Sequence, residues 1–342
     1  MSEPLVSVKM ITYNHGPYIA QAIEGVLQQK TNFRFELVIG EDCSTDRTRE
    51  IVFKCEKKYP DVIRVITSDT NVGAKKNSYR TDKACRGRYI AFCEGDDYWT
   101  DPYKLQKQVD FLENHQDYGM VHGDAGELIQ DSRNFYESKR IDSKQTPSGY
   151  IYEQLLVKNF IYTLTVVVRK QVYLSAISEL DLIDKRWRMG DYPLWLEIAK
   201  HHNIHYIDQR LGVYRRLAES ASHSKDTYRN FLFDQDSFEI QWYFIKKYGA
   251  MPKTIETIKR QYNETISKYA FYLNDKTIME ASDLFKDVGT SLKFRCYYLG
   301  LKYRPFRLVL KTYLKLTNKE QYYRPGLSCS RHESNLSKKV EI

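Results

Sequence analysis

The sequence predicts an α/β fold with a mostly parallel sheet, followed by a C-terminal all-helical region. Over the first half of the chain, short runs of β-branched and apolar residues alternate with stretches of helical periodicity. Polar loops, several of them acidic, come directly after the strand-like runs. From about residue 224 onward the pattern indicates helices only. Strands that alternate with helices of this length imply βαβ units, whose strands run parallel.

The first part of the chain alternates predicted strands and helices in order. The first strand, VSVKMITY, is broken by NHGP, and IAQAIEGVLQQ then places apolar residues at helical spacing. A second helix, TREIVFKCEKKYP, follows N-cap candidates in STD and stops at Pro60. A third helix runs to about residue 85. The other strands of this part are FELVIG, VIRVIT and RYIAF.

After residue 115 the pattern is looser. DYGMVHGDAGEL predicts an edge strand, and TLTVVVR (163–169) predicts a strand that RKQVYLSAI continues as a helix. GDYPLWLEIAKHH predicts a helix with Pro193 in its first turn. NIHYID and LGVYRR are predicted as two short strands. In the helical region the breaks are Gly249–Pro252, Asn274–Asp275 and the surroundings of Pro305.

Composition fits a globular protein and places the basic charge in one segment. The chain has 342 residues, of which 42% are hydrophobic and 28% are charged. The formal net charge is +9, and residues 288–319 contain eight Lys or Arg and no Asp or Glu. Because this segment accounts for almost all of the net charge, the sequence argues against a nucleic-acid-binding surface.

The sequence shows neither a secretory leader nor an apolar run near the roughly 18 residues of a membrane-spanning helix. Its six cysteines have no CxxC spacing. These features favour a cytoplasmic protein. Peripheral attachment to the inner face of the plasma membrane is the alternative that the basic C-terminal segment raises.

Four polar loops follow the four predicted strands of the first part: TYNHGP, GEDCSTD, TSDTNVG and CEGDDYW. In parallel α/β sheets, ligands bind outside the carboxyl ends of the strands. We therefore expect all four loops to open at one edge of the sheet, where acids that are distant in the sequence converge. That edge is the predicted binding site.

The last of these loops carries Glu94, Asp96 and Asp97 directly after a buried strand. Close carboxylates repel one another, and Mg²⁺ or Mn²⁺ relieves the repulsion by taking their oxygens as ligands. Such a cation can also bridge the oxygens of a diphosphate. The alternative is a solvated acidic turn in which Asp101 caps a helix that begins at Pro102. Spacing alone does not decide between them.

Taken in order, VSVKMITYNHGPYIAQAI, ELVIGEDCSTDRT, NVGAKKN and GRYIAFCEGDDYW resemble segments of the inverting family 2 glycosyltransferases with a GT-A fold. GDYPLW and LGVYRR resemble the downstream elements of that family, so the resemblance spans about residues 5 to 220. It implies a GT-A nucleotide-diphospho-sugar transferase domain over residues 1–222. Residues 223–320 then form a helical C-terminal region and 321–342 a flexible tail.

The resemblance implies a hexosyltransferase of bacterial polysaccharide assembly, such as capsule or O-antigen synthesis. Its reaction is metal-dependent transfer of a single hexose, with inversion, from a nucleotide-diphospho-sugar to a hydroxyl. A UDP-sugar is the expected donor, and a glycan or lipid-linked glycan the expected acceptor. Two alternatives stay open. One is a sugar-nucleotide nucleotidyltransferase, although TYNHGPY lacks a Gly-rich basic phosphate loop. The other is a catalytically inactive GT-A scaffold in a glycan-assembly complex.

The resemblance also implies the residues of the site. Asp97 is the foremost ligand for Mn²⁺ or Mg²⁺, with Asp96 and Glu94 beside it. Glu94 stands where Asp is common in the family. Glu41 likewise stands where the family usually has Asp. In the family, this acid accepts a hydrogen bond from the base of the nucleotide. The implied donor-binding residues are Thr12, Tyr13, Asn14, Glu41, Asp42, Asn71, Lys76 and Asp96.

Asp191 lies in GDYPLW at the start of a predicted helix. Similar enzymes place the general base here, the carboxylate that accepts the proton of the acceptor hydroxyl. A helix N-terminus favours the ionised form of such a carboxylate. The alternative is a residue that only caps its helix. Trp195, one turn later, is either a sugar-stacking side chain or a core tryptophan.

Processive members of the family carry a QxxRW motif after the general base. Here Arg186–Trp187 precedes Asp191, and Ile183 stands where Gln would be. The sequence therefore predicts a non-processive enzyme that adds one sugar per encounter.

The basic segment SLKFRCYYLGLKYRPFRLVLKTYLKL interleaves apolar, aromatic and basic residues. This composition suits helices that lie on an anionic membrane surface, which would fit a lipid-linked acceptor. The alternative is a helical region that packs on the catalytic domain and turns a basic face to solvent.

Overall fold

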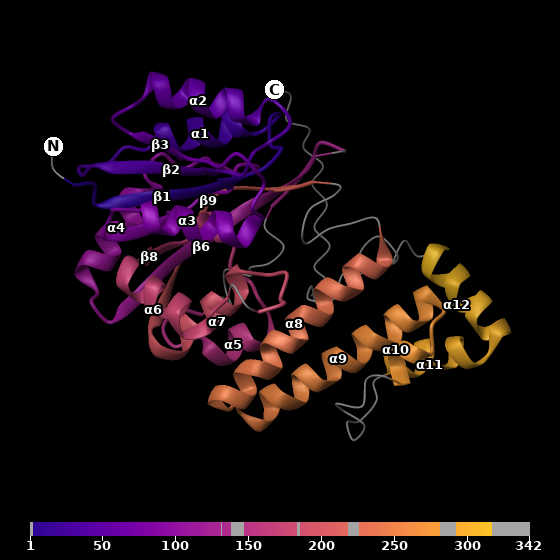
Figure 1. The fold of residues 1–342 in the computed structure, drawn as a ribbon. Helices are drawn as coiled ribbons and strands as arrows, with labels where there is room; N and C mark the ends of the chain where they lie inside the picture. Colours follow the sequence, from indigo (N-terminus) through magenta and orange to yellow (C-terminus); the bar gives the residue numbers. More distant parts are fainter. Residues whose placement is uncertain are drawn as a thin grey trace.

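The computed structural model describes residues 3–130, 132–137, 147–182, 185–217, 226–280 and 292–316. A single mixed sheet forms the centre of the molecule, and a group of helices extends from one side of it (Figure 1). The strand order is β3-β2-β1-β4-β8-β6-β9-β5, and β7 pairs with β6.

The first half of this sheet is parallel, as the alternation of patterns predicts. In β1 the residue Val8 faces Leu37 of β2 on one side and Ala91 of β4 on the other. All three side chains are buried. The elements of this half are β1 (Val6–Thr12), α1 (Ile19–Leu27), β2 (Phe35–Glu41), α2 (Thr48–Lys58), β3 (Ile63–Ile66), α3 (Ala74–Ala84) and β4 (Tyr89–Phe92).

The second half of the sheet is mixed, and its antiparallel pairings are short beside the parallel ones. β8 pairs antiparallel with both β4 and β6, and β5 pairs antiparallel with β9, whereas β6 and β9 are parallel. These pairings join segments that are far apart in the sequence, so local periodicity could not reveal them. The strands are β5 (Tyr98–Trp99), β6 (Tyr118–Ile129), β7 (Asn134–Tyr136), β8 (Val167–Arg169) and β9 (Asn203–Arg216).

Three local predictions in this half were wrong. The predicted edge strand is β6, which lies between β8 and β9 and is buried over most of its length. The two predicted short strands form one continuous strand, β9, whose pairing with β6 shifts near Arg210. Only 167–169 of the predicted strand 163–169 is extended, because Thr163–Thr165 forms a 3₁₀ turn (η1).

Consecutive strand residues enter two different cores, as expected for a sheet with helices on both faces. Ile90 packs with α5, α6 and α7, whereas its neighbour Ala91 packs with α1, α2 and α4. In Figure 1, α1 and α2 lie above the strands and α5, α6 and α7 below them. These later helices are α4 (Lys104–Asn114), α5 (Tyr152–Val157), α6 (Lys170–Leu180) and α7 (Asp191–His201).

Beyond residue 226, all described elements are helices, as predicted. Ile240 and Phe244 of α8 belong to the same core as α5, α6 and α7, so α8 packs directly on the sheet-containing part. α9 then leads away to the last helices (Figure 1). The helices are α8 (Thr227–Tyr248), α9 (Pro252–Leu273), α10 (Thr277–Glu280), α11 (Leu292–Lys302) and α12 (Arg304–Leu316).

The predicted helix breaks are confirmed. α8 is capped by Asp226, which accepts from Tyr228 N, and it ends before Gly249, whose φ of +73° favours glycine. The predicted domain boundary at 222/223 and the tail 321–342 lie outside the described residues. Among the described helices, none has both the length and the apolar character that crossing a membrane requires.

Candidate functional site

The carboxyl ends of β1, β2 and β4 meet at one edge of the sheet. Asp42 N donates to Thr12 O (3.1 Å), and Gly95 N donates to Ile11 O (3.1 Å). A Cβ atom at Gly95 would lie 2.6 Å from Thr12 Oγ1, so glycine lets the turn after β4 approach β1 this closely. The structure therefore brings together the loops that follow these three strands, as the parallel topology predicts.

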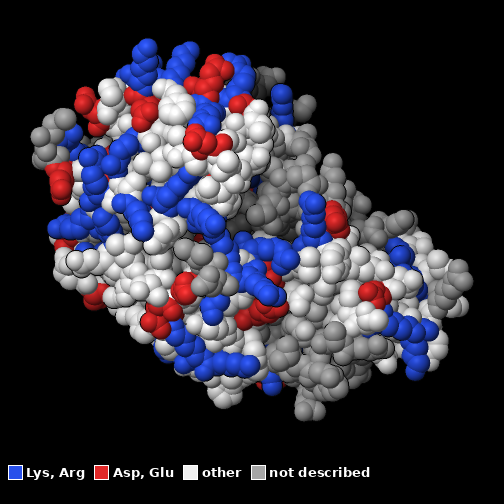
Figure 2. All heavy atoms as spheres, in the orientation of Figure 1, with Lys and Arg blue, Asp and Glu red and all other residues white. Residues whose placement is uncertain are grey.

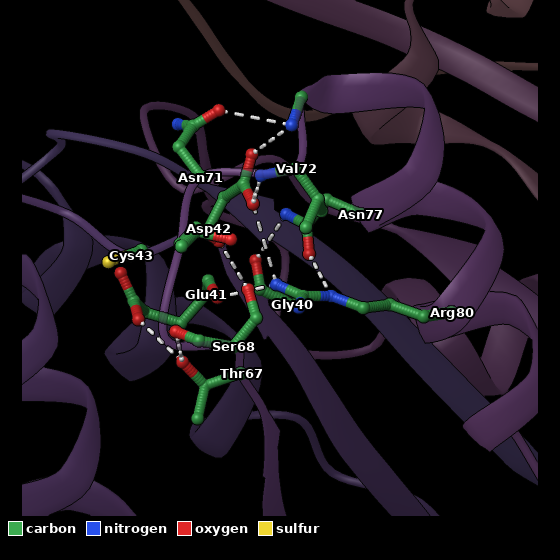
Figure 3. A network of polar contacts seen from close by, with 12 residues as sticks. Gly40, Glu41, Asp42, Cys43, Thr67, Ser68, Asn71, Val72, Asn77 and Arg80 are labelled. Carbon is green, nitrogen blue, oxygen red and sulfur yellow. Dashed lines mark hydrogen bonds and ion pairs between the residues drawn. The ribbon is translucent and has the colours of Figure 1, made fainter.

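The carboxylate of Glu41, at the end of β2, is fully buried and holds neighbouring loops (Figure 3). Its Oε1 accepts from Ser44 N (2.6 Å) and its Oε2 from Thr67 Oγ1 (2.9 Å). Arg49 Nε lies 3.4 Å from Oε2. Both carboxylate oxygens thus have partners within the protein. The predicted hydrogen bond from Glu41 to a nucleotide base stays a prediction.

Asp42 holds the turn before α3 in the same way (Figure 3). Its Oδ1 accepts from Val72 N (2.9 Å) and its Oδ2 from Gly73 N (3.0 Å). Asn71 Oδ1 accepts from the same Gly73 N, and Arg80 Nη2 lies 3.6 Å from Asp42 Oδ1. Asp42 therefore fixes the loop to which Asn71 belongs.

Asn14 fastens the loop after β1 to the loop after β2. It has a φ of +55°, and its N donates to Ser44 Oγ (3.0 Å). Its Oδ1 accepts from Thr45 N (2.9 Å). Two residues further on, Gly16 N donates to Asp46 Oδ2 (2.8 Å). These bonds place the predicted donor-binding residues of both loops beside one another.

Four of the predicted donor-binding residues, Tyr13, Asn14, Asn71 and Lys76, are exposed, whereas Thr12, Glu41 and Asp42 are buried. Tyr13 is 42% exposed, and Lys76 lies in the first turn of α3. An exposed aromatic ring beside the strand ends offers a stacking surface for a planar ligand.

The acids after β4, which are Glu94, Asp96 and Asp97, differ from the pair after β2. They lie close to one another, and few hydrogen-bond donors of the protein contact their carboxylates. Burial raises the pKa of Asp97 well above its usual value, and the charges of Asp96 and Glu94 raise it further. Burial and the charge of Asp96 likewise raise the pKa of Glu94 to about 8. This mutual repulsion is what a bound divalent cation removes.

Three buried polar atoms at this edge have no hydrogen-bond partner among the described residues: Thr12 Oγ1, His15 Nδ1 and Glu94 Oε2. A Cβ at Gly95 would lie within 2.9 Å of the first two, so both atoms line the same turn. His15 Nε2 is 4.0 Å from Asp96 Oδ2. Buried polar atoms without partners cost free energy, so they indicate that a polar ligand completes the site.

The donor chemistry of this site suits a hard cation, but its geometry is incomplete. Carboxylate oxygens are the ligands that Mn²⁺ and Mg²⁺ take. Across the ranges that the structure describes, no three His, Cys, Asp or Glu side chains are arranged as a ready metal site. Oxygens from a second ligand would therefore have to complete the coordination.

Arg215, near the end of β9, is a buried residue of this site that sequence reasoning missed. Its N donates to Asp97 Oδ1 (2.8 Å) and its Nε to Asp96 O (2.8 Å). Its guanidinium also donates to Gln21 Oε1 (2.7 Å) and Gln130 Oε1 (2.8 Å). Arg215 thus pins the acidic turn to two other elements. The sequence offers little signal for it, since Arg216 stands beside it and β9 carries other charged residues, Asp208 and Arg210.

Asp191 is the first residue of α7, as predicted. Its Oδ2 accepts from Thr163 Oγ1 (2.6 Å) and its Oδ1 from Tyr192 N (2.7 Å). The charge of Asp191 contributes to the raised pKa of Glu94, which places it near the acids after β4. The structure therefore brings a carboxylate from the second half of the chain to the cluster from the first.

Packing settles the role of Trp195, and the structure corrects where the helix after the acidic turn begins. Trp195 is fully buried, with its ring edge-to-face to Phe92 at 5.5 Å, so it is a core tryptophan. The helix after the acidic turn begins at Lys104 rather than Pro102. Asp101 Oδ1 accepts from Tyr103 N (2.8 Å), and Asp101 also pairs with Lys107, so its capping role is local to this turn.

Comparison with known proteins gives a consistent result. The family model described as glycosyl transferase family 2 matches residues 7–168. The uncharacterized protein Rv1520 of Mycobacterium tuberculosis is 35% identical over 228 residues, which are 66% of this chain and 62% of that protein. The match therefore covers less than two thirds of the length of this relative.

A second relative is WfgD of Escherichia coli, named as UDP-Glc:alpha-D-GlcNAc-diphosphoundecaprenol beta-1,3-glucosyltransferase. It is 31% identical over 208 residues, which are 61% of this chain and 75% of that protein. Among solved structures, the mannosyltransferase PcManGT from Pyrobaculum calidifontis, in complex with GDP-Man and Mn²⁺, has a TM-score of 0.55 and 14% identity. The match covers 94% of this chain and 88% of that structure, so the two share a fold.

Proposed function

The chain belongs to glycosyl transferase family 2, with a GT-A fold, and from this premise we propose that it transfers a single hexose from a nucleotide-diphospho-sugar to a hydroxyl. The transfer is metal-dependent and inverts the anomeric carbon. A UDP-sugar is the proposed donor, and the acceptor is a glycan or a lipid-linked glycan. The observation that carries the proposal is the repelling acid cluster after β4, in which Glu94 Oε2 is buried without a hydrogen-bond partner among the described residues and the charge of Asp191 adds to the raised pKa of Glu94.

Asp97, Asp96 and Glu94 are the residues that would hold Mn²⁺ or Mg²⁺. The oxygens of the donor's diphosphate are the natural source of the missing ligands. When bound, the cation neutralises the charge that develops on the departing nucleoside diphosphate. The Mn²⁺ and GDP-Man in the PcManGT structure support this choice of metal and ligand class.

Asp191 is the proposed general base. The hydrogen bond from Thr163 Oγ1 and the bond from Tyr192 N hold its carboxylate in one orientation. The acceptor hydroxyl loses its proton to Asp191 as its oxygen bonds to the anomeric carbon. The bond from that carbon to the diphosphate oxygen breaks on the opposite face, and its electron pair leaves with the diphosphate. The configuration is therefore inverted.

The exposed ring of Tyr13 and the loops fastened by Asn14 and Asp42 form the proposed surface for the nucleoside. Asn71 and Lys76 lie on the loop and helix that border it. WfgD is named for a UDP-sugar and PcManGT was solved with a GDP-sugar, so both bases belong in any test.

The last helix supports the proposed contact with an anionic membrane. α12 packs Leu310 and Leu314 against Phe271, while Val309 is 67% exposed. Phe306, Leu308 and Tyr313 are also exposed apolar side chains of this helix. Figure 2 shows blue Lys and Arg side chains at the right-hand end, where Figure 1 places α11 and α12. Apolar and basic side chains together suit anionic lipid.

Vesicle flotation tests this membrane contact. The full chain should float with vesicles that contain anionic lipid and not with neutral ones. Val309→Asp should reduce flotation, whereas Phe53→Asp, an exposed aromatic on α2, should leave it unchanged. Failure of the full chain to float on anionic vesicles would favour the other interpretation, helices that only pack on the catalytic part.

Release of nucleoside diphosphate tests the reaction itself. The protein is incubated with Mn²⁺, a panel of UDP- and GDP-sugars and candidate acceptors. Release that disappears in Asp97→Ala and drops strongly in Asp191→Asn supports a transferase. Pyrophosphate formed from a sugar phosphate and a nucleoside triphosphate would instead indicate a nucleotidyltransferase. The absence of donor binding in calorimetry would indicate a scaffold.

A further inference from the structure

The segment 185–190, which leads into Asp191, is held by the C-terminal helix α8. Arg188 N donates to Asp236 Oδ2 (2.7 Å), and Arg188 Nη1 donates to Asp236 Oδ1 (2.9 Å). One carboxylate on α8 thus binds both the backbone and the side chain of a residue three positions before Asp191. Two such bonds fix the position and the direction of the segment.

Other contacts along the same segment also lead to α8. The ring of Trp187 lies edge-to-face to Tyr243 at 5.3 Å, and Ser237 Oγ donates to Met189 Sδ (3.7 Å). Trp187 and Met189 are buried in the core that contains Phe244 of α8. Three consecutive residues before the catalytic helix therefore rest on α8.

The carboxylate of Asp191 is held by a residue of the sheet-containing part of the molecule rather than by α8. Its carboxylate accepts from Thr163, which belongs to η1 beside the sheet. The direction of the carboxylate is thus set by Thr163, and the path of the chain that delivers it is set by Asp236. Shifting this path would move Asp191 while leaving the acids after β4 in place.

A second acid on the same helix has a different task. Asp234 Oδ2 accepts from Tyr269 Oη of α9 (2.7 Å), so this acid fastens α8 to α9. Asp236 faces the segment before Asp191 instead, and its side chain is 8% exposed. Asp234 and Asp236 therefore lie on different sides of α8 and contact different elements, which makes Asp234 a suitable control for Asp236.

We propose that Asp236 is a positioning residue for Asp191, and that α8 is consequently part of the catalytic apparatus rather than an appendage. The inference rests on the proposed function, since it presupposes that Asp191 acts as the base. Both Arg188 and Asp236 lie outside the range 7–168 that the family model matches. Both residues therefore belong to the part of the chain that follows the matched range.

The test compares Asp236→Asn with Asp234→Asn, using the full chain. Asp236→Asn should lower kcat for transfer by about 10- to 100-fold, because a displacement near 1 Å at a reacting group costs about this much. The dissociation constant of the Mn²⁺–donor complex should stay within about 2-fold, since the acids after β4 are untouched. Asp234→Asn should change neither quantity.

Two further variants separate the possible failures. Loss of transfer in Asp191→Asn, together with an Asp236→Asn variant as active as Asp234→Asn, would overturn the inference and leave the proposed base intact. Full activity of Asp191→Asn would overturn the assignment of the base. If Asp236→Asn does not fold, Arg188→Ala replaces it, because the Arg188 side chain is half-exposed. An unchanged kcat in Arg188→Ala would then overturn a positioning role of the side-chain bond, since the backbone bond from Arg188 N remains in this variant.

Discussion

Two groups of acids follow buried strands of the same sheet, and they have opposite surroundings. After β2, each carboxylate of Glu41 and Asp42 accepts hydrogen bonds from donors of neighbouring loops. After β4, Glu94 has a buried oxygen that finds no partner among the residues the structure describes, and its pKa is raised by burial and by Asp96. Similar sequence patterns therefore give one acid pair that stabilises the loops and one acid group to which we expect a ligand to bind.

The difference shows that an acid pair at a strand end is not by itself a binding site. A carboxylate that is saturated by internal donors stabilises the protein, because breaking its bonds leaves buried donors unpaired. A carboxylate that repels its neighbours destabilises the free protein and gains most when a cation arrives. The first group should therefore be needed for folding, and the second for binding.

The largest effect is expected from Asp97→Asn. Loss of one carboxylate from the repelling group should lower transfer activity on the order of 10²-fold or more, because charge stabilisation at the diphosphate is lost. The measurement is the rate of nucleoside diphosphate release with Mn²⁺. Asp101→Asn is the matched control, since Asp101 follows only four positions later, beyond β5, and pairs with Lys107. Equal losses in both variants would contradict a specific role for Asp97.

Glu41→Gln should act on stability instead. The variant removes a buried charge that Ser44, Thr67 and Arg49 surround, so the free energy of unfolding should fall by about 3 kcal/mol. Urea unfolding followed by circular dichroism measures this change. Glu50→Gln, on the exposed surface of α2, provides the control and should change the stability by less than about 0.5 kcal/mol. A Glu41→Gln variant as stable as the wild type would contradict the stabilising role of the acids after β2.

Arg215→Met tests whether the Arg215 side chain holds the acids after β4 in place. The backbone bond to Asp97 remains, but the bonds from the guanidinium to Asp96 O, Gln21 and Gln130 are lost. The affinity for Mn²⁺ with nucleoside diphosphate should fall by about 10-fold, as for other residues that orient metal ligands. Arg216→Met, whose partner is Glu127, should leave this affinity unchanged. Titration calorimetry of both variants decides the matter.

The smallest effect is a dependence of stability on pH in the absence of metal. The folded pKa of Glu94, about 8, lies above the usual value of about 4.3 for an unfolded chain, so the folded state binds the proton more tightly. The stabilising contribution of the protonated form is present at low pH and is lost as the pH rises through 8. Glu94→Gln should therefore melt higher than the wild type at pH 8.5, with a smaller difference at pH 5. Equal melting temperatures at both pH values would show that Glu94 is not under repulsion.

The meeting of the loops could be predicted from the sequence, because it follows from local alternation and from the parallel connections of β1, β2 and β4. The internal partners of Glu41 could not be predicted, since Thr67 comes from a different strand end. The same holds for Arg215 and Asp236, whose partners lie 118 and 48 positions away in the sequence. Residues that act through distant partners have no local pattern to reveal them.

The mixed half of the sheet illustrates the same limit. β6 was predicted at an edge, yet it lies between β8 and β9. His122 of this strand is fully buried, and burial lowers its pKa to about 3, so it is neutral in the core. A histidine that packs as a neutral ring cannot be distinguished from a surface histidine by sequence.

The acids after β4 should bind the cation and the diphosphate, whereas the acids after β2 support the loops. Calorimetric titration with Mn²⁺ and UDP or GDP, whichever binds the wild type, tests this division of roles in Asp97→Asn and Glu41→Gln at a temperature where both are folded. Affinity should be lost in Asp97→Asn and kept within about 3-fold in Glu41→Gln. Affinity kept in Asp97→Asn and lost in Glu41→Gln would contradict this division of roles.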